Sequence, residues 1–133
     1  MNKFVYYLYL FVQWTWGILQ SLLGLLLYLK LHACHHFRYK GSYGTLWPYS
    51  GGVSLGCFIF VSRMDADILQ HEYGHTIQSL VLGPLYLLII GLPSFIWCKT
   101  PYFIRKRQNE NISYYKLYTE RWADRLGGNP KRY

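Results

Sequence analysis

The chain has 133 residues, enough for one compact domain, and 52% of them are hydrophobic, 20% aromatic and only 15% charged. Its formal net charge is +8, and its Lys and Arg residues flank long apolar runs instead of forming a stripe on a polar domain. We therefore expect a lipid bilayer, most favourably an anionic one, as partner and exclude nucleic acid. Three widely spaced cysteines without a C-x-x-C pair exclude a disulfide framework.

The first predicted element spans residues 4–29, a run without any charged residue. As one helix it would be about 39 Å long, against a hydrocarbon core of about 30 Å. We therefore predict an N-terminal transmembrane helix. A signal peptide is too short to explain the run, and no small-residue cleavage site follows it. Two alternatives remain: the aromatic first part lies in the membrane interface, or the run is a fully buried helix.

Residues 30–40 are basic and contain three histidines close to Cys34. Three interpretations stay open for them: a solvated segment at a membrane edge, a metal-binding tract, or a donor role in which His35 or His36 stabilises a transition-state oxyanion. Residues 41–52 are rich in Gly and Ser and are predicted to be a loop. Residues 53–62 alternate between two faces and are rich in β-branched and aromatic residues, which predicts a short strand or hairpin.

The next predicted element is a helix over residues 65–82, ended by Gly83-Pro84, and it contains His71-Glu72-Tyr73-Gly74-His75. On a helix, His71 and His75 share one face and can supply two ligands to a zinc ion. Glu72 then lies beside the metal, where a general base for a water molecule is needed. The alternative without a metal is that the motif is a polar patch on a core helix.

Residues 85–98 form a second apolar segment, interrupted at Gly91-Leu92-Pro93, and residues 99–107 after it are strongly basic. A full crossing of the bilayer here would carry any later ligand about 30 Å from His75. We therefore predict a re-entrant, Gly/Pro-broken segment whose two ends return to the same side, the cytoplasmic one by the charge rule.

The last predicted helix covers residues 110–126 and carries Glu120 and Asp124 on one face. Glu120 can be the third zinc ligand, leaving one position open for water, and Asp124 can fix the tautomer of a ligand histidine. The alternative is that Glu120 pairs with Lys116 on the surface and that both acids are solvated.

Together, H-E-x-x-H at 71–75 and E-x-x-x-D at 120–124 resemble the signature of the gluzincin metallopeptidases, the thermolysin-like group. The resemblance covers two short helices and extends to the site, not to the whole fold. It implies His71, His75 and Glu120 as zinc ligands, Glu72 as general base and Asp124 as the partner of a ligand histidine. Enzymes of this kind also commonly place a strand edge beside the active-site helix. A site-two-protease pattern fits less well, because the chain offers only Gly128-Asn129-Pro130 where an N-P-D-G motif is needed.

We therefore predict a single membrane-embedded domain over residues 1–133 that is mostly α-helical. It would bind one zinc ion and hydrolyse peptide bonds of a peptide or membrane-protein substrate near the cytoplasmic face. The alternative is a non-catalytic membrane interaction protein whose zinc site is structural or absent. The oxyanion donor stays open among histidines and tyrosines: His35, His36, Tyr43, Tyr73, Tyr114, Tyr115 and Tyr118.

Overall fold

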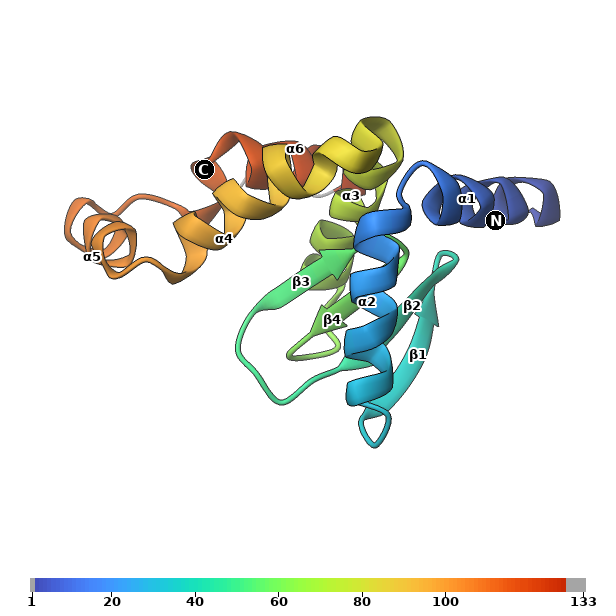
Figure 1. Ribbon diagram of the computed structural model, residues 1–133. Coiled ribbons are helices and arrows are strands. Elements are labelled where there is room, and N and C mark those ends of the chain that lie inside the picture. The colour runs from blue at the N-terminus through green and yellow to red at the C-terminus, as the bar shows by residue number, and fades with distance from the viewer. Residues whose placement is uncertain (1, 129–133) are drawn as a thin grey trace.

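The computed structural model describes residues 2–128, which form helices around a small mixed sheet (Figure 1). The elements in chain order are α1 (Lys3–Thr15), α2 (Ile18–Lys30), β1 (His35–Tyr39), β2 (Ser42–Leu46), β3 (Gly52–Leu55), β4 (Phe58–Val61), α3 (Ala66–Leu82), the 3-10 turn η1 (Gly83–Leu85), the π-helical η2 (Leu87–Gly91), α4 (Leu92–Lys99), α5 (Pro101–Glu110), the 3-10 turn η3 (Tyr114–Lys116) and α6 (Tyr118–Gly127).

The sheet has the strand order β1-β2-β4-β3, with β2 parallel to β4 and the two outer pairs antiparallel. Strand β4 is buried along its whole length because helices cover both faces of the sheet, α2 in front and α3 behind (Figure 1). Ile59 and Val61 pack against α3, whereas Phe58 and Phe60 share a cluster with side chains of α1 and α2. This sheet was not expected from the sequence beyond one strand or hairpin.

The predicted strand over residues 53–62 is a hairpin, because Gly56 turns the chain between β3 and β4. Its φ angle is +65°, in the region that favours glycine, and a Cβ at this position would lie 2.1 Å from the hydroxyl oxygen of Ser21. Strand β3 is therefore an edge strand, with β4 as its only strand neighbour in the sheet.

The prediction of a transmembrane helix over residues 4–29 is wrong, because the run divides into α1 and α2, whose axes are bent by 96°. The bend packs closely on α3: a Cβ at Gly17 would lie 3.0 Å from Ser79 Oγ. No single helix within residues 2–128 has both the length and the apolar character to cross a membrane. Two bent pairs, α1 with α2 and Ala66–Leu85 with Leu87–Lys99, meet those two criteria jointly.

A buried polar cluster fills the bend and is called the elbow cluster here; its members are Gln13, Gln20, Ser21 and Ser79. Gln13 Nε2 donates to the carbonyl of Thr76 at 3.0 Å, and Ser79 Oγ donates to Gln13 Oε1 at 2.8 Å. Gln20 Nε2 lies 2.7 Å from Ser79 Oγ and 2.9 Å from the Gly83 carbonyl. These neutral hydrogen bonds hold the first two helices against α3.

The C-terminal half of the chain also differs from the predicted membrane fold. The apolar stretch leaves α3 through Gly83, with φ +55°, and the following helix runs at 118° to α3. The break thus falls at residues 83–87, whereas Gly91 and Pro93 lie inside helical backbone. The single helix predicted over 110–126 is also wrong: α5 ends at Glu110, the following Asn111 has φ +52°, and α6 begins at Tyr118. The protein is thus mostly helical with a mixed four-stranded sheet, and the segment predicted to be broken at Gly91-Leu92-Pro93 is the continuous helical stretch of η2 and α4.

Candidate metal centre

Helices α3 and α6 pack tightly and in opposite directions, because glycine faces backbone at two points of contact. A Cβ at Gly74 would lie 1.8 Å from the carbonyl oxygen of Ala123, and one at Gly127 would lie 1.8 Å from that of Gln70. No larger residue fits at this approach without moving a helix. The two glycines therefore allow the H-E-x-x-H helix and the E-x-x-x-D helix to bring their polar faces together.

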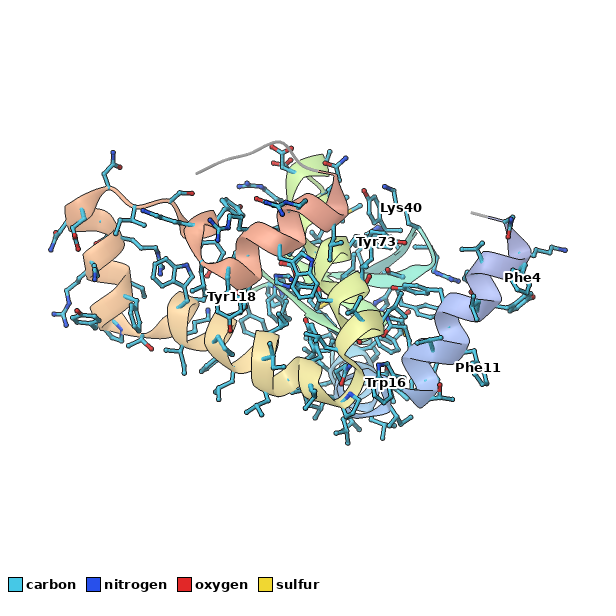
Figure 2. All side chains as sticks on the ribbon, turned by 90° about the horizontal axis from the view of Figure 1, so that it is seen from above. Phe4, Phe11, Trp16, Lys40, Tyr73 and Tyr118 are labelled. Carbon is cyan, nitrogen blue, oxygen red and sulfur yellow. The ribbon has the colours of Figure 1, made fainter. Side chains whose placement is uncertain are left out.

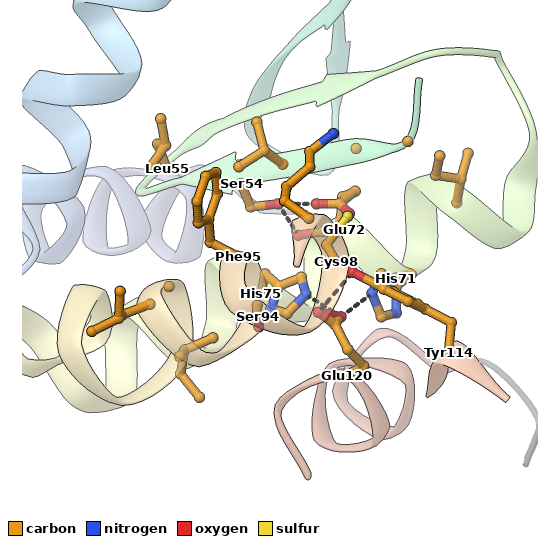
Figure 3. A pocket seen from close by; sticks show the side chains of 18 of the residues that line it. Ser54, Leu55, His71, Glu72, His75, Ser94, Phe95, Cys98, Tyr114 and Glu120 are labelled. Carbon is orange, nitrogen blue, oxygen red and sulfur yellow. Dashed lines mark hydrogen bonds and ion pairs between the residues drawn. The ribbon is translucent and has the colours of Figure 1, made fainter. Parts of the chain in front are cut away.

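Glu120 lies between the two histidines of α3 (Figure 3). Its Oε2 atom is 2.8 Å from Nε2 of His71 and 3.0 Å from Nε2 of His75. The Nδ1 atom of His71 lies 2.7 Å from Oδ1 of Asp124, so the second nitrogen of that ring also meets a carboxylate. All four side chains are at least 95% buried. The structure thus brings the two predicted motifs together in one buried cluster.

The orientation of His75 is fixed by a residue of its own helix. Its Nδ1–H donates to Gln78 Oε1 at 2.6 Å, and Gln78 Nε2 donates in turn to the carbonyl of Thr119 at 3.0 Å. Because Nδ1 of each histidine is already bonded, both Nε2 atoms point to the same place beside Glu120. Such outer hydrogen bonds set the tautomer and the ring angle of metal-binding histidines.

Glu72 occupies the strand side of the cluster, next to β3 (Figure 3). The hydroxyl of Ser54 lies 2.7 Å from Oε2 and 2.7 Å from the main-chain carbonyl oxygen of Glu72. A Cβ at Gly52 would come within 2.9 Å of Glu72 Oε1. Strand β3 thus supplies both a hydrogen bond and the space that the Glu72 side chain needs.

The electrostatics of the cluster favour a positive charge at its centre. Burial alone opposes protonation of His71, but its hydrogen bonds to Asp124 and Glu120 outweigh burial and raise its pKa to about 10. Burial likewise opposes protonation of His75, yet the charge of Glu120 raises its pKa above the ordinary value. Burial would raise the pKa of Glu120, whereas the two histidines hold that pKa well below its usual range. The carboxylate of Glu120 therefore stays ionised and requires a cation next to it.

Two other groups of the site retain their protons more strongly than in water. Burial raises the pKa of Glu72, partly opposed by the nearby histidines. Burial also raises the pKa of Tyr114, and the charge of Glu120 adds to this effect. The hydroxyl of Tyr114 donates to Glu120 Oε1 at 3.1 Å. Glu72 has the raised pKa that suits a proton-transfer group, and Tyr114 remains a neutral donor.

The residues present fit a metal ion. His71, Glu72 and His75 form a buried group that can hold one, because one ligand atom of each lies within 4.8 Å of the others. Glu120 Oε2 lies closer still to both imidazoles. Neutral imidazole nitrogens and carboxylate oxygens are ligands that several divalent metals accept, zinc among them.

A cavity of about 710 Å³ opens beside the cluster, within the size range of small-molecule and peptide sites. Its walls come from β3, α3, η2, α4, η3 and α6, and most of the side chains that line it are apolar. Figure 3 shows Phe95 and Leu55 on one side of the cavity and Tyr114 on the other, with the metal-centre residues between them. A substrate in the cavity would therefore contact both an apolar wall and the polar cluster.

The predicted oxyanion donors divide into two groups. Tyr114 and Tyr115 line the cavity, and the Tyr115 ring lies edge-on to the His71 ring at 5.1 Å. Tyr118 instead donates to the Ile89 carbonyl at 2.8 Å from an exposed position. The other four lie outside the cavity lining: His35 and His36 on β1, the opposite edge of the sheet from β3, Tyr43 on β2, and Tyr73 packed against Tyr9 and Tyr39. Asn129 and Pro130, which bear on the site-two-protease comparison, lie outside the described residues.

Three residues of the site were not predicted from the sequence: Ser54, Gln78 and Tyr86. Tyr86 is buried at the cavity wall and donates to the carbonyl oxygen of Ser54 at 2.9 Å. Ser54 and Gln78 contact Glu72 and His75 directly. Of the three, only Gln78 could have been predicted to contact the site. It lies three residues after His75 on the same helix, and side chains at that spacing are neighbours on the helix surface.

Comparisons with known proteins give no further identification. No protein-family model matches the chain, and neither the curated proteins nor the solved structures contain a match.

Proposed function

We propose that this protein is a zinc-dependent hydrolase of peptide bonds. One observation carries the proposal: Glu120 Oε2 is within 3.0 Å of Nε2 of both histidines, although 45 and 49 residues separate it from them in the chain. Two imidazoles and one carboxylate are the protein ligands of a catalytic zinc site that keeps one position open. Zinc bound there would polarise a carbonyl group and lower the pKa of a water molecule towards 7.

Glu72 is the general base in this mechanism. It takes a proton from the attacking water as the water oxygen bonds to the carbonyl carbon, and it returns a proton to the amine nitrogen when the C–N bond breaks. Ser54 holds one of its carboxylate oxygens at 2.7 Å and thereby fixes the side chain beside the two histidines. The raised pKa of Glu72 is suited to a group that must both accept and release a proton.

Tyr114 is the residue that we propose as donor to the oxyanion. Among the tyrosines predicted for this role, its hydroxyl contacts a carboxylate of the metal centre, Glu120 Oε1, at 3.1 Å. Its raised pKa keeps the hydroxyl protonated, so that it can donate to the negative oxygen of the tetrahedral state.

Strand β3 is the element that we propose to bind an extended substrate. It is an edge strand, and residues 52–55 line the cavity next to Glu72. A peptide can add to such an edge through main-chain hydrogen bonds, as in other cases of β-augmentation. Peptides that are N-methylated on either side of the cleaved bond should then bind much more weakly than the unmodified peptide, whereas methylation at a distant amide should have no effect.

The first experiment measures bound metal per chain after purification without added chelator. Glu120→Ala should lose the zinc, whereas Glu110→Ala, which removes an exposed carboxylate from α5, should keep it. Thermal melting of both variants would show that each is folded. Zinc that survives the loss of Glu120 would separate the two motifs and would contradict the proposed ligand set.

A structural metal site is the second candidate, because Glu72 lies within 4.8 Å of the ligand atoms of His71 and His75 and can itself be a ligand. With Glu120 that makes four protein ligands and no open position, which is typical of structural zinc. The protein would then be a non-catalytic binding protein. Glu72→Gln discriminates between the two: retained zinc with lost turnover supports the hydrolase, and lost zinc supports the structural site.

A further inference from the structure

Three helices form one broad face of the molecule in front of the sheet. Helices α1 and α4 extend to opposite sides, and α2 runs between them along the front of the sheet (Figure 1). From above, Figure 2 shows Phe11 and Trp16 on one edge of the molecule and Lys40 and Tyr73 behind them, and α1 runs back from that edge towards Phe4. This face, formed by α1, α2, η2 and α4, is called the helical face here.

The helical face exposes large apolar side chains from all of its helices. Phe11 of α1 is 66% exposed, Leu26 of α2 is 65%, Leu88 of η2 is 63% and Phe95 of α4 is 64%. Large apolar patches of this kind mark interaction surfaces in proteins. The face is therefore an apolar surface that no described residue covers.

The charges on the helical face are of one sign. Residues 3–30 and 83–99 contain no Asp or Glu, whereas each helix has one exposed lysine at one of its ends: Lys3 on α1, Lys30 on α2 and Lys99, which also lines the cavity, on α4. A second copy of the chain would bring lysines and no carboxylate against these lysines. An anionic lipid surface supplies the missing negative charge, and lysines at helix ends can extend to lipid headgroups.

We propose that the helical face lies on an anionic lipid bilayer, with α2, α4 and the Phe11–Trp16 end of α1 at the membrane surface. Helices of 13, 13 and 8 residues are at most about 20 Å long, which suits helices that lie in the interface better than helices that cross about 30 Å of hydrocarbon. Binding of this kind combines the burial of apolar side chains with attraction between lysines and anionic headgroups.

The position of the face also specifies where the cavity opens. Leu92 and Phe95 line the cavity, and both are at least half exposed on the helical face. The rim of the cavity therefore meets the bilayer surface, so that apolar chain segments at that surface are the substrates which the cavity can reach. This part of the inference rests on the proposed hydrolase function, whereas the binding to lipid does not.

Flotation with vesicles tests the proposal on the metal-free protein, so its result is independent of hydrolysis. The wild type should bind vesicles of phosphatidylcholine mixed with phosphatidylserine more strongly than vesicles of phosphatidylcholine alone. Leu26→Glu should weaken binding about tenfold, through lost burial of one large side chain. The matched control is Met64→Glu, which adds the same charge at a 53% exposed apolar residue outside the face and should bind as the wild type does.

Charge-neutral replacement of the lysines tests the electrostatic part. The triple variant Lys3→Gln, Lys30→Gln, Lys99→Gln should bind both kinds of vesicle equally. Melting curves verify that each variant is folded. Equal binding by Leu26→Glu and Met64→Glu would overturn the proposal. So would a lipid-free dimer that Leu26→Glu dissociates, together with no binding of the wild type to vesicles, because the face would then join two copies of the chain.

Discussion

Helix α3 has a buried polar cluster on each of two sides, and the two clusters differ in kind. The elbow cluster contains only amides and hydroxyls, which donate to and accept from one another or backbone carbonyls. The metal centre contains ionisable groups: His71, His75, Glu72, Glu120 and Asp124. Neutral groups can satisfy one another without a net charge, whereas converging carboxylates require a cation, either protons on the histidines or a metal ion. Burial of polar groups therefore does not by itself distinguish a functional site. The charge that the buried cluster must hold is the distinguishing property.

The largest expected effect is a loss of turnover that leaves zinc binding intact. Glu72→Gln keeps the shape of the side chain but removes the base, so kcat should fall by at least about 10³-fold while bound zinc stays unchanged. Gln13→Leu in the elbow cluster should leave kcat unchanged. Kinetics with a fluorogenic peptide and metal analysis of the same samples measure both. Wild-type turnover in Glu72→Gln would contradict its role as base.

The next effect concerns the proposed oxyanion donor. Tyr114→Phe should lower kcat about 100-fold with little change in KM or in zinc content, because the hydrogen bond is needed only in the transition state. Tyr118→Phe is the matched control, since that hydroxyl bonds to the Ile89 carbonyl. If both variants lost the same activity, the effect would be structural.

Gly74, at the contact between α3 and α6, should be more sensitive to substitution than a helical glycine with space around it. Gly74→Ala places a methyl group 1.8 Å from the Ala123 carbonyl oxygen, so the helices must separate, at a cost of about 1–3 kcal/mol in unfolding free energy, with weaker zinc binding. At Gly91 the nearest atom to an added Cβ is 3.6 Å away, so Gly91→Ala should be neutral or slightly stabilising. Denaturant titration of the two variants measures the difference. Equal effects would contradict the tight packing.

The elbow cluster should affect stability alone. Gln13→Leu leaves the Thr76 carbonyl and the Ser79 hydroxyl without their present partner, at a cost of about 1–3 kcal/mol in unfolding free energy. Zinc content should remain that of the wild type. Loss of zinc in this variant would show that the two clusters are coupled through α3.

The last prediction is a pH dependence of stability that only the metal centre should produce. In the metal-free protein, His71 has a pKa of about 10, above its ordinary value of about 6.5. A histidine with a raised pKa stabilises the fold at low pH and loses this contribution as the pH rises towards 10. Melting temperature should therefore fall over this range in the presence of chelator. Zinc-loaded protein should show a smaller fall, because zinc binds the deprotonated histidines. A flat profile without metal would contradict the charge assigned to His71.

The sequence predicted the metal-centre helix well, because its signals are local. The helix expected over 65–82 lies at Ala66–Leu82, since Asp65 accepts from the Asp67 amide at its start and Gly83-Pro84 ends it. The site ligands followed from spacing within each helix. That they meet depends on Gly74 and Gly127, whose role becomes visible only when α6 lies against α3.

The errors came from features that depend on distant contacts. Hydropathy over residues 4–29 does not indicate the bend. The bend depends on hydrogen bonds from Gln13 to the Thr76 carbonyl and from Gln20 to the Gly83 carbonyl, which are distant in the sequence. Strand β2 was predicted as loop because the longer stretch 41–52 is rich in glycine and serine, yet the strand pairs with both β1 and β4. Ser54 gave no signal of its contact with Glu72, since the hairpin turn at Gly56 determines where β3 lies.

Forty-nine residues separate His71 from Glu120 along the chain, and the three cysteines are free. An ion held by both side chains would close that long loop as a cross-link does, which corresponds to about 4 kcal/mol of loop entropy removed from the unfolded chain. Because one ligand comes from α6 and two from α3, the bound ion would tie the two helices together. Opening of this helix pair in the native protein should therefore be rarer with metal than without it.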